Sequence, residues 1–307
     1  MNNISLVIIG RNEGKNLKRT LSSIKTNQFK NIIYVDSSSI DNSIEIAKNS
    51  KKTSKIIKVL SNKYSAALAR NVGLKYVNTE LVQFLDGDQT LSDKWIKKAS
   101  NFLNLNQNTA IVHGYKYEFN DKENLNKFTI RRDNKNWQAD YLQGSFLAKT
   151  EVLKKVNFMD IRFKVGEERD LYVRIHNKGY KVWYLDEFMS SHYNFKPRGL
   201  KYILFSGLFI YYLFPLIKYI FSKKIFSFIF VHRFLLPQLI IEVFSITALI
   251  ISIKNIPTIL VIQLLSLIIY KVNRRKGQWL IWKAVIINFF RIPSLYRPEV
   301  IYSHYEI

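Results

Sequence analysis

The chain has 307 residues, of which 48% are hydrophobic, and this is enough apolar material for a sizeable folded core. It carries 47 Lys and Arg against 23 Asp and Glu, a formal charge of +24, so we expect it to attract polyanions such as nucleic acids, nucleotide diphosphates or an anionic membrane surface. Cysteine is absent, which excludes disulfides and thiolate metal sites and suits a cytoplasmic location. The first residues lack the basic and apolar segments of a secretory signal, so we expect none.

Up to about residue 195, short apolar runs alternate with polar stretches of helical character. The pattern predicts strands at residues 4–9, 31–35, 56–60, 81–85 and 110–113, and helices at residues 15–25, 41–49, 66–77 and 94–105. Strand and helix in alternation indicate an α/β domain with a parallel sheet. In open sheets of this kind, ligands bind beyond the C-terminal ends of the strands.

Polar loops follow the first two predicted strands. Arg11 and Glu13 lie in the first loop, where a nucleotide contact and a solvated turn are both reasonable interpretations. Asp36 directly follows the second strand and is the better ligand candidate there, whereas the serines and Asp41 after it are expected to cap the next helix. Gly-x-Gly-x-x-Gly and Walker-type sequences are absent, so the sequence indicates neither dinucleotide nor P-loop binding.

The Asp86-Gly87-Asp88 segment is the most informative feature of the chain. It directly follows residues 81–85, an apolar run typical of a buried strand, so its carboxylates lie at a C-terminal strand edge. Two carboxylates separated by one glycine can converge on a hard cation, which can in turn hold a diphosphate. The ordinary alternative is an Asp-Gly turn between a strand and the next helix.

Several segments together resemble the family 2 glycosyltransferases of GT-A fold. In the family's order they are residues 7–13 (VIIGRNE), 34–41 (YVDSSSID), 69–73 (ARNVG), 84–88 (FLDGD), 144–147 (GSFL), 165–174 (VGEERDLYVR) and His192. The resemblance covers about residues 4–195 and leaves the remainder of the chain unexplained. It implies an α/β GT-A domain at residues 1–199, with a Rossmann-like mixed and mostly parallel sheet.

The resemblance also implies roles in binding a nucleotide-sugar donor. Glu13 and Asp36 would hold the nucleoside, with Arg11 beside them and Arg70 near the sugar nucleotide. Gly144 would lie at the acceptor side of this site, where the backbone must approach the substrate closely. Two alternatives remain open: Arg70 could form an ion pair within its helix, and Gly144 could be only a tight turn.

A divalent cation is the cofactor that the resemblance implies. Asp86 and Asp88 would hold Mg²⁺ or Mn²⁺ on the donor diphosphate, because a cation stabilises the negative charge that the departing nucleoside diphosphate gains. His192 follows an expected strand at residues 182–185, where the family often places a histidine near the metal. An imidazole is an acceptable third ligand beside two carboxylates, although a lone histidine is more often a packed or surface residue.

Glu167 and Glu168 are the candidate catalytic residues. A transfer reaction needs a carboxylate that takes a proton from the acceptor hydroxyl as it attacks the anomeric carbon. The family usually has Glu-Asp here, with the second acid as the base, so the resemblance points to Glu168 rather than Glu167. The alternative is a charged first turn of a helix that runs to about residue 177. A single base without a nucleophilic carboxylate implies inversion at the anomeric carbon.

After residue 200 the composition changes to long apolar runs with basic flanks. The runs cover residues 203–217, 234–253 and 256–270, and residues 200–307 carry thirteen Lys and Arg against three acids. Twenty helical residues span about 30 Å, the thickness of a bilayer's hydrocarbon core. We therefore expect an α-helical, membrane-associated region at residues 200–307, with a hairpin at residues 234–270 whose ends are both cytoplasmic.

Other interpretations of this region remain open. Glu242 near the middle of one run, and the shortness of the other arm, make an interfacial or re-entrant hairpin a serious rival to a spanning one. Residues 278–296 are typical of an amphipathic interfacial helix. An apolar dimerisation subdomain is the soluble alternative.

The sequence thus predicts a metal-dependent inverting glycosyltransferase at the cytoplasmic face of the cell membrane. It would move one sugar at a time from a nucleotide-sugar donor to a hydroxyl of a lipid-linked or surface glycan, since the Gln-x-x-Arg-Trp signature of processive synthases is missing. A polyprenyl-phosphate glycosyltransferase is the nearest alternative. A nucleic-acid-binding protein is a less favoured one, because the aromatic residues concentrate in the apolar runs, and no nucleic-acid partner is expected.

Overall fold

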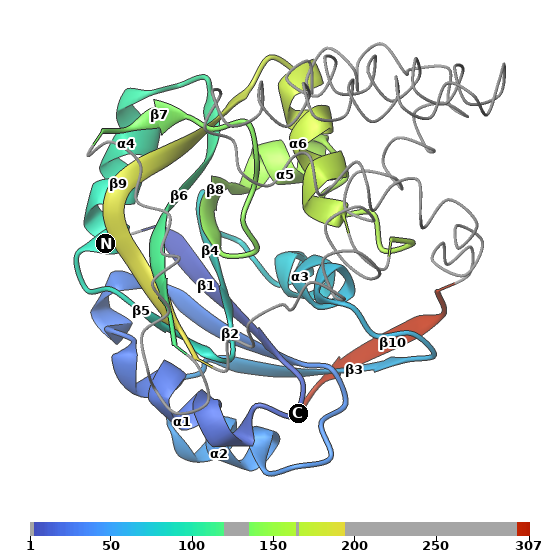
Figure 1. Cartoon of the computed structure of the whole chain (residues 1–307). Helices are drawn as coiled ribbons and strands as arrows, with labels where there is room; N and C mark the ends of the chain where they lie inside the picture. Colours follow the sequence, from blue (N-terminus) through green and yellow to red (C-terminus); the bar gives the residue numbers. More distant parts are fainter. Residues whose placement is uncertain (1–2, 120–134, 164–165, 194–299) are drawn as a thin grey trace, which may run out of the picture. The chain divides into compact units, whose positions relative to one another are not determined.

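A ten-stranded mixed sheet is the centre of the part of the chain that the structure, a computed structural model, describes: residues 3–119, 135–163, 166–193 and 300–307 (Figure 1). The strand order is β10-β3-β2-β1-β4-β8-β6-β9-β5, and β7 pairs with β9 off this path. The strands are β1 (Ile4–Gly10), β2 (Asn31–Asp36), β3 (Lys55–Ser61), β4 (Leu81–Asp86), β5 (Gln89–Leu91), β6 (Thr109–Glu118), β7 (Trp137–Gln138), β8 (Phe146–Lys149), β9 (Lys181–His192) and β10 (Tyr302–Glu306). The helices are α1 (Gly14–Ser23), α2 (Ser43–Asn49), α3 (Ala66–Lys75), α4 (Trp95–Leu105), α5 (Thr150–Lys155) and α6 (Glu167–Asn177), and a 3₁₀ turn covers Thr26–Gln28.

The parallel part of the sheet consists of β3, β2, β1 and β4. Strand β1 pairs in parallel with both β2 and β4, and β2 pairs in parallel with β3. Nearly every residue of β1, β2 and β4 is buried, because helices cover both faces of these strands. The predicted α/β fold with its parallel central strands is therefore confirmed.

Helices lie on both faces of this sheet (Figure 1). Apolar residues of α1, α2 and α4 share one core cluster with one face of β1 and β2. On the other face, α3 contacts β1 and β2 through Gly73, where a Cβ would lie only 2.4 Å from a Val7 methyl carbon. Glycine is needed there because any side chain would push the helix off the sheet.

The other half of the sheet differs from the predicted alternation of strand and helix. Strand β5 follows Asp88 before helix α4 begins, and it pairs antiparallel with β9. Strand β8 is inserted antiparallel between β4 and β6. Strand β6 does not end at residue 113 but continues to Glu118, with register irregularities along its parallel pairing with β9. These additions bring the ends of β4, β6 and β9 to one place.

The last strand of the chain belongs to this same sheet. Strand β10 pairs antiparallel with β3 at the sheet's edge, so residues 297–307 form one compact unit with residues 1–197. Residues 198–296, which are not part of this unit, lie outside the described residues. The expected C-terminal region was residues 200–307, and the structure thus assigns its final residues to the α/β unit.

The expected membrane elements lie outside the described residues: both the hairpin at residues 234–270 and the interfacial helix at residues 278–296. Among the residues that the structure does describe, no helix is long and apolar enough to cross a membrane.

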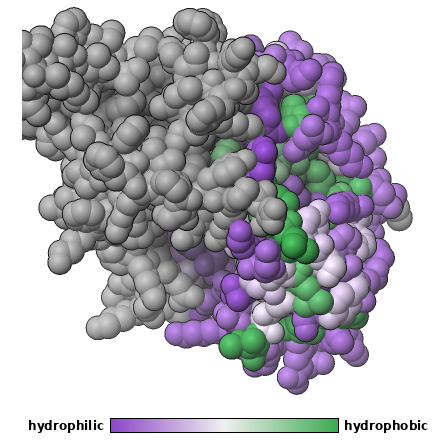
Figure 2. All heavy atoms as spheres, turned by 90° about the vertical axis from the view of Figure 1, so that its right-hand side faces the viewer, coloured by the Kyte–Doolittle hydropathy of each residue, from purple (hydrophilic) through white to green (hydrophobic). Residues whose placement is uncertain are grey.

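The described surface is mainly hydrophilic on the face shown in Figure 2, with small separate apolar areas. Over the described ranges, the exposed large apolar side chains are Ile40, Leu60, Leu105, Ile301, Tyr305 and Ile307.

Candidate active site

A cavity of about 350 Å³ opens at the C-terminal ends of β1, β4 and β9, and we call it the strand-end cavity. Its lining residues come from these strand ends, from the loops that follow them and from the start of α3: Ile9, Gly10, Arg11, Glu13, Ser37, Tyr64, Ser65, Ala66, Ala69, Arg70, Asp86, Gly87, Asp88 and His192. This is the edge of the sheet where the sequence predicted the ligand site.

The loop after β1 is held in place by the loop after β2. The Asn12 backbone N–H donates to Ser39 Oγ at 2.9 Å, and the Ile40 N–H donates to Asn12 Oδ1 at 2.9 Å. The Glu13 N–H donates to Ser43 Oγ at 2.9 Å. Asn12 adopts a left-handed backbone with φ 58°, a conformation that asparagine tolerates better than most residues. These contacts fix Arg11 and Glu13 at the mouth of the cavity, where the Arg11 guanidinium lies 4.2 Å from the ring centre of Tyr64.

Glu13 is an unusual carboxyl group. Burial and the charges of Asp88 and Asp86 raise its pKa from 4.5 to about 7. It lies close to the turn after β4, since a Cβ on Gly87 would be 3.1 Å from Glu13 Cγ. Three carboxyl groups are therefore gathered within electrostatic range of one another, which favours binding of a cation.

Asp36 does not line the cavity. It is fully buried at the end of β2 and accepts hydrogen bonds from the Ser39 N–H at 2.7 Å, from Ser39 Oγ at 2.6 Å and from the Tyr34 hydroxyl at 3.2 Å. Both of its oxygens are thus used to hold the loop after β2. Asp36 thus supports the loop, and its contact with a nucleoside stays a prediction.

An ion pair between a buried arginine and a half-buried aspartate forms the floor of the cavity. Arg70 Nη2 donates to Asp86 Oδ1 at 2.6 Å, and Arg70 is only 2% exposed. Burial opposes the charge of Arg70, but Asp86, Glu168 and Glu167 raise the pKa of its guanidinium. Gly144 lies directly over this pair, because a Cβ there would be 2.7 Å from Arg70 Nη2 and 3.7 Å from Asp86 Oδ2. The backbone of residue 144 thus packs so closely on Arg70 that a side chain there would displace the guanidinium.

Gln89 holds the other side of Asp86. Its side-chain amide donates to Asp86 Oδ2 at 3.0 Å, and its carbonyl oxygen accepts from Ser145 Oγ at 2.9 Å and from Ser190 Oγ at 3.2 Å. Gln89 is 2% exposed, and its bonds with Ser145 and Ser190 are buried. The Asp86 carboxylate is thus fixed from both sides.

Glu167 and Glu168 occupy the first turn of α6, which begins after Gly166 in a left-handed backbone with φ 91°. Burial and the neighbouring charge of Glu168 raise the pKa of Glu167. Oε2 of each glutamate is buried and has no hydrogen-bond partner among the described residues. Glu167 is buried and Glu168 is half-buried, so Glu168 is the more accessible of the two. The two carboxylates act electrostatically on Arg70, which links them to the floor of the cavity.

His192 ends strand β9 and joins three other charged groups. Its Nε2 lies 3.0 Å from Asp88 Oδ2, and its Nδ1 lies 2.5 Å from Glu118 Oε2. The other carboxylate oxygen of Glu118 pairs with Lys116 Nζ at 3.1 Å. Burial opposes the charged imidazole, but the hydrogen bonds to Asp88 and Glu118 raise the pKa of His192 to about 9.

The fit of a divalent cation can be tested on these donors. Within the described ranges, no three His, Cys, Asp or Glu side chains lie close enough to hold a metal ion alone. Asp88 and His192 nevertheless bring a carboxylate oxygen and an imidazole nitrogen together at the cavity wall. Mg²⁺ is commonly bound by one or two protein groups together with substrate phosphates and water. The donor set therefore fits a cation that shares its ligands with a diphosphate.

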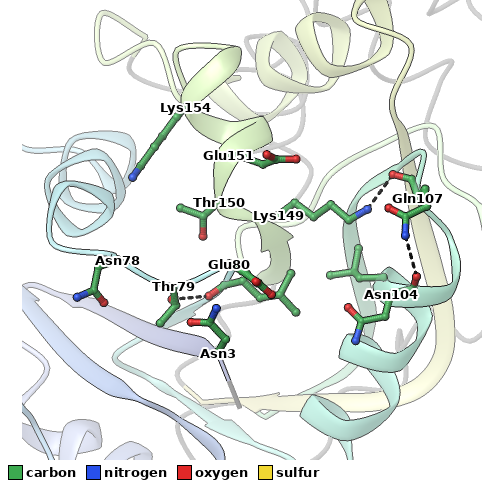
Figure 3. A pocket seen from close by; sticks show the side chains of 12 residues that line it. Asn3, Asn78, Thr79, Glu80, Asn104, Gln107, Lys149, Thr150, Glu151 and Lys154 are labelled. Carbon is green, nitrogen blue, oxygen red and sulfur yellow. Dashed lines mark hydrogen bonds between the residues drawn. The ribbon is translucent and has the colours of Figure 1, made fainter. Parts of the chain in front are cut away.

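A larger cavity of about 760 Å³, the rear cavity, lies at the opposite ends of β1 and β4 (Figure 3). Its lining combines amide and hydroxyl groups with two lysines and two glutamates: Asn3, Asn78, Thr79, Glu80, Leu81, Leu103, Asn104, Gln107, Lys149, Thr150, Glu151 and Lys154. Lys149 Nζ is already bound to the Gln107 carbonyl oxygen at 2.7 Å. None of the predicted site residues lines this cavity, whereas six of them line the smaller strand-end cavity.

The structure thus brings together most of the residues that the sequence singled out. Those lining the strand-end cavity are Arg11, Glu13, Arg70, Asp86, Asp88 and His192, and those adjoining Arg70 are Gly144, Glu167 and Glu168. Sequence reasoning missed Gln89 and Glu118, which contact the cavity residues from behind. The one available signal was the position of Gln89, two residues beyond Gly87.

Comparisons with known proteins identify the family of the chain. Residues 5–184, more than half of the chain, match the family Glycosyl transferase family 2. TarP of Staphylococcus aureus (strain N315), a poly(ribitol-phosphate) beta-N-acetylglucosaminyltransferase, is 29% identical over 124 residues, which are 38% of this chain and 38% of TarP. An uncharacterized glycosyltransferase of Haemophilus influenzae (strain ATCC 51907 / DSM 11121 / KW20 / Rd) is 28% identical over 169 residues, 52% of this chain and 67% of that protein.

Solved structures show the same fold. The crystal structure of Staphylococcus aureus TarS 1-349 in complex with UDP-GlcNAc superposes with a TM-score of 0.56 at 16% identity, covering 69% of this chain and 64% of that one. The matched region is thus about two fifths of TarP and just under two thirds of the TarS fragment. At this identity the likeness establishes the GT-A-like fold alone. The match over residues 5–184 goes further: the chain belongs to glycosyl transferase family 2.

Proposed function

We propose that this chain transfers a sugar from a UDP-sugar donor to an acceptor hydroxyl, with inversion at the anomeric carbon. The single observation that carries the proposal is the Arg70–Asp86 ion pair, whose two members line the strand-end cavity and whose buried arginine is also under the electrostatic influence of Glu167 and Glu168 of α6. The TarS fragment that shares this fold was solved with UDP-GlcNAc, which supports a uridine diphosphate donor.

Arg70 is suited to receive the donor's diphosphate. It lines the cavity, and its Nε and Nη1 atoms have no hydrogen-bond partner among the described residues. A buried guanidinium with unused donors binds phosphate oxygens in a fixed, bidentate geometry. Arg11 at the cavity mouth adds a second positive charge, and the neighbouring Tyr64 ring offers a face for a nucleobase.

We further propose that Asp88 and His192 bind a divalent cation, Mg²⁺ or Mn²⁺, together with that diphosphate. When bound there, the cation would stabilise the charge that the leaving diphosphate gains. Asp86 remains paired with Arg70, which keeps the floor of the cavity electrically balanced. The charge of Asp88 raises the pKa of Glu13, so a cation bound at Asp88 would stabilise the Glu13 carboxylate as well.

Glu168 is the proposed general base. Glu167 is almost fully buried and holds its proton more readily than an ordinary glutamate, whereas the half-buried Glu168 can meet an incoming acceptor. The proton of the acceptor hydroxyl would pass to the Glu168 carboxylate as the hydroxyl oxygen attacks the anomeric carbon and the sugar–phosphate bond breaks. Gly144 brings its backbone close to Arg70, because a Cβ there would lie 2.7 Å from Arg70 Nη2, and we propose that the acceptor enters beside it.

The acceptor that we propose is a lipid-linked or surface glycan at the cytoplasmic face of the cell membrane, to which single sugars are added. Support comes from the composition after residue 200, with its long apolar runs and thirteen Lys and Arg against three acids. Truncation at residue 199 would also remove β10, so the test should retain it. A chain whose residues 198–296 are replaced by a short polar linker should leave the membrane fraction; recovery of that chain in the pellet would contradict membrane binding through this region.

Donor hydrolysis is the direct test of the proposed activity. A panel of UDP-, GDP- and dTDP-sugars, assayed with Mn²⁺ for release of nucleoside diphosphate, should show a UDP-sugar as the preferred donor. Once an acceptor is known, Glu168→Gln should lower its transfer rate about 10²-fold or more, as expected when a positioned base is lost. Glu167→Gln is the matched control and should cost less. A larger loss in Glu167→Gln than in Glu168→Gln would show that the base is the other glutamate.

A further inference from the structure

Glu118 contacts His192 on the side opposite Asp88, and the function proposed above assigns it no role. Its Oε2 lies 2.5 Å from His192 Nδ1, while His192 Nε2 lies 3.0 Å from Asp88 Oδ2 on the cavity side. Lys116 Nζ, 3.1 Å from Glu118 Oε1, holds the other carboxylate oxygen. Glu118 therefore contacts the Nδ1 atom of His192, whereas the Nε2 atom meets Asp88 on the cavity side.

The backbone around this group is fixed by pairing between strands. Glu118 of β6 lies in register with His192 of β9, and the Phe119 N–H donates to the His192 carbonyl at 2.8 Å. Gln89 of β5 pairs with His192 from the other side, and the Tyr193 N–H donates to the Asp88 carbonyl at 3.0 Å. Because three chain segments are bonded at this point, the backbone positions of Glu118, His192 and Asp88 are fixed relative to one another.

We propose that Glu118 is a positioning residue: by accepting a hydrogen bond from His192 Nδ1, it turns the imidazole so that Nε2 and Asp88 Oδ2 together bind the divalent cation. This inference rests on the cation site of the proposed function. Histidines that bind metals almost always donate their second ring N–H to a carboxylate or carbonyl, which fixes the tautomer and the ring orientation. Glu118 supplies that carboxylate, and Lys116 balances its charge.

Glu118 could have a purely structural role, in which its side chain only links β6 to β9. Two variants distinguish this role from that of positioning His192. Glu118→Gln keeps an oxygen that can accept from Nδ1–H, whereas Glu118→Met has similar length and no acceptor. Glu187→Ala is the control, because Glu187 belongs to β9, the strand of His192, but pairs with Lys98 instead of the histidine. Circular dichroism and thermal melting establish that each variant is folded.

The experiment is a calorimetric titration of the full chain with UDP, with and without Mn²⁺. The wild type and Glu187→Ala should bind UDP more tightly when Mn²⁺ is present. Glu118→Met should lose about 10–100-fold of that Mn²⁺-dependent gain, with UDP binding in the absence of metal unchanged, and Glu118→Gln should keep most of it. Pulsed EPR of bound Mn²⁺ should show ¹⁴N coupling from an imidazole in the wild type and lose it in Glu118→Met.

Two results would overturn the inference, and they are distinguishable. A folded Glu118→Met that keeps both the full Mn²⁺-dependent gain and the ¹⁴N coupling would remove the role of Glu118 and leave the cation site standing. A wild type that binds UDP equally well with and without Mn²⁺, and shows no ¹⁴N coupling, would remove the cation site and the positioning role together.

Discussion

The substitution Gly144→Ala tests the geometry of the cavity floor most sharply. A Cβ at this position would lie 2.7 Å from Arg70 Nη2, whereas ordinary van der Waals contact begins at 3.4 Å, so the guanidinium must move by several tenths of an ångström. Arg70 is buried and bound to Asp86 Oδ1 at 2.6 Å, and Gln89 fixes the other oxygen of Asp86. The guanidinium therefore cannot move without weakening its ion pair. The backbone of Gly144 is not left-handed, so alanine adds no backbone strain.

Because misplacement of a substrate-binding group by about 1 Å can cost about 10²-fold in rate, we expect Gly144→Ala to lower kcat/KM for a UDP-sugar by about 10–100-fold. The stability cost of overpacking should be about 1–3 kcal/mol, measured by denaturant unfolding. Arg70→Lys removes Nη2, so adding Gly144→Ala to that variant should cost much less activity than it does in the wild type. Equal losses in both backgrounds, or no loss in the wild type, would refute the proposed contact.

Two further predictions concern stability. Burial lowers the pKa of His113 from 6.5 to about 4, so as the pH falls the unfolded chain binds a proton at this imidazole before the folded chain does. The free energy of unfolding should therefore keep its full value above about pH 6.5. It should fall by about 1.4 kcal/mol per pH unit as the pH drops toward 4. His113→Gln should flatten that part of the profile in urea titrations, and an unchanged slope would contradict a buried neutral imidazole. Deletion of residues 300–307 should cost about 2–4 kcal/mol in thermal unfolding, because it removes β10 and its backbone hydrogen bonds with β3. Glu306→Ala, which breaks only a half-exposed ion pair with Lys55, should cost less than about 1 kcal/mol, and equal effects of the two changes would show that strand pairing contributes little.

The parallel strands were predictable because each is a continuous apolar run between polar turns. Residues 4–9, 31–35 and 81–85 match β1, β2 and β4 closely, since burial on both faces favours apolar residues at most positions. The helices were predicted with similar success, and α4 differs from the expected residues 94–105 by one residue.

The antiparallel additions were not predictable in the same way. Strand β10 is short, polar and largely exposed, and it forms only because β3, far away in the sequence, offers it an open edge. Strand β6 continues past residue 113 through half-buried positions, where pairing with β9 decides the conformation instead of an apolar pattern. Long-range pairing of this kind leaves little trace in local sequence.

The site shows the same division between local and long-range causes. Asp86 and Asp88 were predictable because a strand end determines where they lie. The burial of Asp36 depends on a loop that turns back, so that the Ser39 N–H and hydroxyl reach its carboxylate. Glu118 could not be identified from sequence, because its meeting with His192 requires β6 and β9 to be neighbours.

The account is tested most directly by a crystal structure of the full chain with UDP and Mn²⁺, in which anomalous scattering locates the metal. We predict one manganese peak in contact with Asp88 and His192, with the diphosphate of UDP reaching toward Arg70 in the strand-end cavity. A nucleotide bound in the rear cavity, or a manganese ion away from Asp88 and His192, would contradict the proposed site.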